Sequence, residues 1–81
     1  MKEKLDTWLD HAFAVVEERT DKCSIKEYFV MLGLIADMIY DKTMRRTSVE
    51  NTIFNCGLTE ENAACMFELW EQLDIISEEG S

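Results

Sequence analysis

The chain has 81 residues and a net charge of −9, with 47% apolar residues, 10% aromatic residues, three glycines and no proline. This length makes a single domain over residues 1–81 with a small core, and the apolar content excludes a disordered chain. The scarcity of turn-forming residues excludes a many-stranded β fold, so we expect an all-α domain of four helices.

The first expected element is an N-terminal helix within residues 1–20, running from about Lys2 to Arg19. Its apolar residues recur at helical spacing and predict one buried stripe made of Leu5, Trp8, Leu9, Ala12, Phe13 and Val16. His11, the only histidine, lies off this stripe and is expected at the surface.

The second helix is expected to begin just after Ser24, because Ser24 and Glu27 have the spacing of a capping box. Between Tyr28 and Tyr40 apolar residues occur on nearly every face, which predicts a central helix surrounded by the others. Gly33 inside this helix costs up to ~1 kcal/mol relative to alanine, unless close helix packing uses the missing side chain.

Two more helices are expected in the C-terminal half. Thr47 and Glu50 repeat the capping-box spacing, which predicts a short third helix over residues 48–56, followed by Gly57 at a position that favours positive φ. Thr59 is expected to cap the fourth helix, with a buried stripe of Ala63, Met66, Phe67, Trp70 and Leu73. Residues 75–77 then predict a short extended segment.

This order of elements is that of a winged helix-turn-helix. The residues that match a known pattern are Ser48, Phe54, Gly57, Ala63, Ala64, Met66, Phe67, Glu68, Trp70, Glu71, Ile75, Ile76 and the closing Glu-Glu-Gly-Ser. On these residues, 48–81 resembles the DNA-reading gamma domain of FtsK/SpoIIIE-type DNA translocases, and with the second helix the resemblance covers residues 24–81. It implies a winged-helix-like core with at most a vestigial wing.

The residues expected to read DNA differ from that family. There, basic residues flank the alanine pair, whereas here Asn62 and Cys65 take those positions, with Glu60 and Glu61 upstream. Residues 1–58 hold ten acids and eight bases, but residues 59–81 hold seven acids and no base. Because duplex DNA carries one negative charge per ~1.7 Å of its axis, such a helix is repelled by DNA.

The acidic helix instead predicts a cationic protein partner, because carboxylates can imitate phosphates on a basic surface that normally binds nucleic acid. The predicted partner-binding residues are Glu60, Glu61, Glu68 and Glu71, with Glu78 and Glu79 as a supplement. Anti-CRISPR and anti-restriction inhibitors of phages and mobile elements share this size and charge. The competing interpretation is that the acids only keep the protein soluble.

Two other functions stay open from the sequence. One is a DNA-binding winged helix that uses Lys42, Arg45 and Arg46. The other is an assembly module that dimerises through the first helix. Aromatic residues are expected in the core, and any that stay exposed would mark a homodimer surface.

The sequence predicts no catalytic, cofactor or metal site. It has no calcium-loop pattern and no Cys/His spacing typical of zinc, and a chain this small leaves little room for a ligand cleft of ~300 Å³ or more. Cys23 and Cys56 are expected to be buried and Cys65 to face outward as an inert thiol. Unpaired cysteines, the absence of a signal-peptide pattern and an apolar run too short to span a bilayer favour a cytoplasmic protein.

Overall fold

Four α-helices and one turn of 3-10 helix form the protein in a computed structural model that describes residues 2–44 and 49–79. The elements are α1 (Lys2–Glu18), η1 (Thr20–Lys22), α2 (Ile25–Met44), α3 (Val49–Asn55) and α4 (Glu60–Glu79). No strand occurs within the two described ranges. The all-α prediction with four helices is therefore confirmed.

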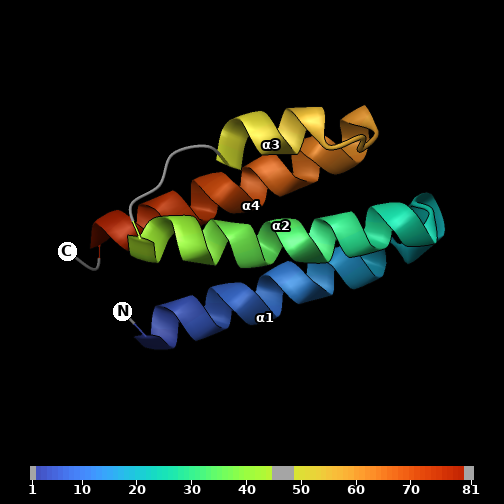
Figure 1. Ribbon diagram of the computed structural model, residues 1–81. Helices are drawn as coiled ribbons and strands as arrows, with labels where there is room; N and C mark the ends of the chain where they lie inside the picture. The colour runs from blue at the N-terminus through green and yellow to red at the C-terminus, as the bar shows by residue number, and fades with distance from the viewer. Residues whose placement is uncertain (1, 45–48, 80–81) are drawn as a thin grey trace.

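The three long helices form a bundle (Figure 1). α1 and α2 run antiparallel, and α4 lies against both of them and runs in the same direction as α2. The short α3 packs on α2 and α4, on the side of the bundle away from α1. The start of α1 and the end of α4 consequently lie at the same end of the molecule (Figure 1).

Local capping signals fix where the helices begin and end. The Ser24 hydroxyl accepts a hydrogen bond from the Glu27 backbone N–H at 3.1 Å, and Thr59 Oγ1 accepts one from the Asn62 N–H at 3.3 Å. Gly57 adopts a φ of 88°, a left-handed conformation that glycine enters without the Cβ clash of other residues. These three predictions are confirmed, whereas the predicted cap at Thr47 lies outside the described residues.

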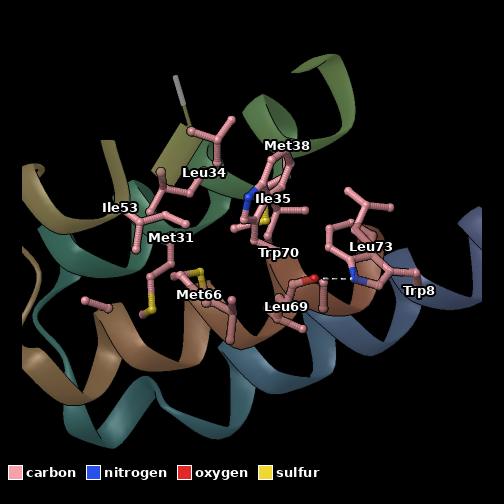
Figure 2. Packing of buried hydrophobic residues seen from close by; sticks show 14 residues of the cluster. Trp8, Met31, Leu34, Ile35, Met38, Ile53, Met66, Leu69, Trp70 and Leu73 are labelled. Carbon is pink, nitrogen blue, oxygen red and sulfur yellow. Dashed lines mark hydrogen bonds between the residues drawn. The ribbon is translucent and has the colours of Figure 1, made fainter. Parts of the chain in front are cut away.

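The core lies where the long helices meet (Figure 2). Its fully or nearly buried apolar residues are Trp8, Ala12, Val16, Met31, Leu34, Ile35, Met38, Val49, Ile53, Ala63, Met66, Leu69, Trp70 and Leu73. The Trp8 indole Nε1 donates a hydrogen bond to the Leu69 carbonyl oxygen at 3.0 Å, shown by the dashed line in Figure 2. This bond satisfies the one polar atom of a buried tryptophan and joins α1 to α4.

Several aromatic residues predicted for the core are exposed. Phe13 at the edge of the α1 stripe, Phe29 in α2 and Phe54 in α3 are 41%, 64% and 61% exposed. Each lies at the border of its helix's apolar arc or beyond it, where the neighbouring helices cover it only in part. Trp8 and Trp70 are buried as predicted, and Phe67 is half-buried against Phe54, with ring centroids 5.6 Å apart.

The prediction of α2 as the central helix is confirmed, but the prediction that the other helices surround it is wrong. α2 does contact all three other helices, but they share one side of it, and its opposite side is open to solvent. Gly33 lies on that open side, and a Cβ built there would meet no atom within 4 Å. Close packing within the chain therefore does not explain this mid-helix glycine.

The predicted extended segment at residues 75–77 is also wrong, because α4 continues as a helix to Glu79. No glycine or proline interrupts residues 60–79, and the half-buried Ile76 follows the buried Leu73 at i+3 on the face that packs on the core. The chain therefore stays helical where a wing was expected, because the helix buries Ile76 against the core.

Candidate functional site

The acidic residues of α4 lie on the side of the helix that faces away from the core. At about 100° per residue, Glu60, Glu61, Glu68, Glu71 and Asp74 fall within a sector of about 140°. All five are exposed. The buried residues of α4, from Asn62 to Leu73, occupy the opposite sector. We call these five acids the α4 acidic face.

The remaining two predicted contact residues, Glu78 and Glu79, belong to the last turn of α4. Their side chains lie outside the part of the chain that the structure describes.

Two bases from other helices bind the edges of the acidic face. Arg19 Nη2 lies 3.3 Å from Glu61 Oε2, and Lys42 Nζ forms an ion pair with Asp74 Oδ1. Glu61 and Asp74 occupy the two margins of the 140° sector, so the central Glu60, Glu68 and Glu71 have no ion pair to a described residue. The sequence excess of acids is therefore partly neutralised at the margins and uncompensated at the centre.

The N-terminal end of the acidic face has a structural role as well. Glu60 and Glu61 occupy the first turn of α4, where carboxylates interact favourably with the positive end of the helix dipole. Glu68 and Glu71 lie in the middle of the helix and gain nothing from either helix end. They are the two acids whose placement is hardest to explain by helix stability alone.

A polar cluster around the buried Asn62 anchors the same end of α4. Asn62 is fully buried, and its Nδ2 donates to Glu27 Oε2 at 3.0 Å while its Oδ1 accepts from Arg19 Nε at 2.5 Å. Glu27 Oε2 also accepts the Thr59 backbone N–H at 3.2 Å. We call Asn62, Glu27, Arg19 and Thr59 the Asn62 cluster.

The hydrogen bond from the Asn62 amide, followed by those from the backbone N–H groups of Thr59 and Ser24, lowers the pKa of Glu27, although desolvation opposes the shift. A carboxylate held ionised in this way is a good acceptor for the cluster. Asn62 is not part of the predicted buried stripe, although helical spacing places it four residues before Met66 and seven before Leu69, on the buried side of α4. With its side chain used inside the fold, Asn62 cannot contact a base edge.

The basic residues of the alternative DNA-binding function are only partly described. Lys42 is engaged within the fold: besides its ion pair with Asp74, its Nζ lies 4.3 Å from the centroid of the Trp70 ring. Trp70 Nε1 in turn donates to Glu50 Oε1 at 3.4 Å. Arg45 and Arg46 lie outside the described residues. The described part of this basic cluster therefore offers no uncommitted cation to a phosphate.

The structure contains a groove between α1 and α4, contrary to the expectation that so small a chain leaves little room for one. Its volume is about 640 Å³. It lies between the first half of α1 and the last turns of α4, and its lining includes the apolar Trp8, Ile75 and Ile76 together with His11 and Gln72. It is open along one side, and Glu3, Lys4 and Thr7 of α1 also line it.

A smaller depression of about 140 Å³ adjoins it and brings His11, Cys65 and Glu68 together. Cys65 is half-buried there, so the prediction of an outward-facing thiol is wrong: α1 covers one side of it. Cys23 and Cys56 are also half-buried rather than buried, and all three thiols are unpaired. No group of three potential metal ligands exists in the described ranges.

No protein-family model, no curated protein and no solved structure matches this chain. The resemblance of residues 24–81 to the gamma domain thus stays a prediction from the sequence. Over residues 2–44 and 49–79, no helix has the combination of length and apolarity that crossing a bilayer requires.

Proposed function

We propose that this chain is a non-enzymatic binding protein whose α4 acidic face docks on the basic, nucleic-acid-binding surface of a partner protein, which it inhibits by occupying that surface. The observation that carries this proposal is the central group of Glu60, Glu68 and Glu71. These three carboxylates are exposed, share one side of a rigid helix and lack a compensating base among the described residues.

The length of the α4 acidic face suits a partner that binds a phosphate backbone. From Glu60 to Asp74 the α4 acidic face extends along about 21 Å of helix, at 1.5 Å per residue. A DNA strand of this length carries about six phosphates, at 3.4 Å each. A groove lined by Lys and Arg for such a strand is complementary in charge to the acidic face, and one-signed fields accelerate docking of this kind.

Duplex DNA is the less favoured ligand. The exposed acids of α4 repel phosphates, Asn62 is buried and Lys42 is bound to Asp74 and Trp70. A DNA contact would have to depend on Arg45 and Arg46.

The test measures binding to an oligo-arginine peptide, used as a stand-in for a cationic groove, at about 50 mM and about 300 mM NaCl. The variant Glu68→Lys/Glu71→Lys reverses two central charges without touching the first turn of α4. It is expected to bind the peptide about tenfold more weakly at low salt and to lose most of its salt dependence.

The matched control is Asp6→Lys/Asp10→Lys, which makes the same change in net charge on the exposed side of α1. Equal weakening by the two variants would show that only total charge matters and would contradict a docking face on α4. Wild-type protein that shifts duplex DNA in a gel at about 150 mM salt, with affinity falling steeply as salt is added, would favour the DNA-binding alternative.

A second experiment addresses the class of partner. The heparin-retained proteins of a cell lysate are passed over immobilised wild-type and reversed protein. We expect retention on wild type, displacement by duplex DNA, and no retention on Glu68→Lys/Glu71→Lys. Retention that duplex DNA does not displace would contradict a shared surface on the partner.

A further inference from the structure

α2 carries a second apolar face that points away from the core. At about 100° per residue, six uncharged residues fall within a sector of about 100° on its open side. We call them the α2 outer stripe: Ile25, Phe29, Leu32, Gly33, Ala36 and Tyr40. Ile25, Phe29 and Tyr40 are 79%, 64% and 49% exposed, and Leu32 is half-buried at the margin.

This stripe contributes little to the fold of one chain. Ile25 and Phe29 have most of their surface in water and Tyr40 about half, and the three residues follow one another along the same side of α2. Contiguous exposed apolar residues on a small domain mark an interaction surface. At the middle of the row, Gly33 and Ala36 remove bulk where a second helix would approach most closely, although nothing within the chain approaches Gly33.

We propose that a second copy of this chain binds the α2 outer stripe, with the two α2 helices packed antiparallel about a two-fold axis close to Leu32 and Gly33. In this register the large residues near the axis lie opposite small ones, and the large residues at the two ends lie opposite each other. Phe29 faces Ala36 of the partner subunit, and Leu32 faces Gly33 of the partner subunit. Ile25 lies opposite Tyr40 of the partner subunit at both ends of the contact.

Charge selects the antiparallel direction. Lys26 and Asp37 are both exposed and border the same edge of the stripe. An antiparallel pair brings Lys26 of each copy to the neighbourhood of Asp37 of the other, so that two symmetric opposite-charge pairs flank the contact. A parallel pair would place the Lys26–Asp37 edges of the two copies on opposite sides of the contact, so neither residue would meet an opposite charge there.

The dimer leaves the α4 acidic face free. α2 and α4 both turn their buried faces toward the core, and the stripe and the acidic face each lie on the side of their own helix that faces away from it. The dimer therefore presents two acidic faces, both outside the contact between the α2 helices. The proposal is independent of the proposed function, because either surface can be removed while the other is kept.

Sedimentation equilibrium from about 1 µM to about 100 µM tests the dimer. Wild type is expected to pass from monomer to dimer in this range, while Phe29→Glu stays monomeric with an unchanged circular dichroism spectrum, because Phe29 is not in the core. Gly33→Leu is the sharper variant: it is expected to raise the melting temperature of the monomer and to weaken the dimer at least about tenfold. If Gly33 had only a structural role within one chain, Gly33→Leu would not raise the melting temperature while weakening the dimer.

The charge pairs test the orientation. Lys26→Asp and Asp37→Lys are each expected to weaken the homodimer, and an equimolar mixture of the two variants is expected to restore association, since every Lys then faces an Asp across the contact. Absence of this rescue overturns the antiparallel arrangement.

A wild-type chain that stays monomeric at about 100 µM overturns the dimer itself, as does a Phe29→Glu variant that still dimerises. Flotation of such a monomer with neutral phosphatidylcholine vesicles would assign the stripe to a lipid surface instead.

Discussion

The Asn62 amide donates a hydrogen bond to the Glu27 carboxylate at 3.0 Å and thereby joins the first turn of α4 to the first turn of α2. The same amide group accepts from Arg19 at the end of α1, so one buried side chain connects three helices. The α4 acidic face begins directly beside this connection. The Asn62 cluster therefore helps to set the orientation of α4 against α1 and α2, and with it the side to which the acids of α4 point.

Loss of the Asn62 amide is expected to be costly. Asn62→Ala leaves the Arg19 and Glu27 groups without their buried partner, which should lower the free energy of unfolding by about 2–3 kcal/mol. Asn62→Asp should also lower it at neutral pH, since it removes the donor to Glu27 and places a second carboxylate beside it, while keeping the acceptor for Arg19. Urea denaturation measures both, and Asn51→Ala, an exposed asparagine of α3, is the control with an expected change within about 0.5 kcal/mol. Equal effects at positions 62 and 51 would show that the cluster does not hold the helices together.

The lowered pKa of Glu27 predicts a pH dependence of stability. Because the pKa is lower in the folded chain than in the unfolded chain, the ionised carboxylate stabilises the fold above the unfolded value of about 4.3. That stabilisation is lost as the pH falls through the folded pKa. Glu27→Gln should therefore melt below wild type at neutral pH, and the difference in Tm should shrink as the solution is acidified. Parallel pH profiles for Glu27→Gln and wild type would contradict this linkage, and Glu68→Gln on the exposed face of α4 is the control.

Gly57 and Gly33 should respond to alanine in opposite directions. Gly57 has a φ of 88°, so Gly57→Ala places a Cβ in a left-handed conformation and should cost about 1–2 kcal/mol. Gly33 is helical and its added methyl group meets nothing within the chain, so Gly33→Ala should stabilise the monomer by about 0.5–1 kcal/mol. Thermal unfolding at a low protein concentration compares them. Destabilisation by both would mean that the open side of α2 is occupied within one chain.

Trp8 should be the main anchor of α1. Trp8→Ala removes a buried indole and its bond to the Leu69 carbonyl, for an expected loss of about 3–5 kcal/mol. Trp8→Phe keeps the bulk but not the donor and should cost about 1–2 kcal/mol. Phe13→Ala on the same helix should cost less than Trp8→Phe, because Phe13 is 41% exposed. An equal loss in the free energy of unfolding for Phe13→Ala and Trp8→Ala would contradict the role of Trp8 as the main anchor of α1.

Local sequence signals determined where the elements lie. Each cap, at Ser24 and at Thr59, depends on residues no more than four positions apart, and the turn depends on Gly57 itself. All three occur as predicted. Helical spacing likewise identified Trp8, Ala12 and Val16 as the buried stripe of α1. The concentration of acids on α4 is also a property of the sequence, since the pitch of a helix alone puts them on one side.

The tertiary structure decided which apolar faces are buried and which charges are paired. α2 is apolar on both sides, and only the position of its neighbours buries Met31 and Met38 while leaving Ile25 and Phe29 in water. Asn62 becomes buried, and Glu61 and Asp74 become paired, through contacts between residues 32 to 43 positions apart. Such contacts depend on the register in which whole helices pack. That register comes from the combined burial of many side chains, which no short stretch of sequence specifies by itself.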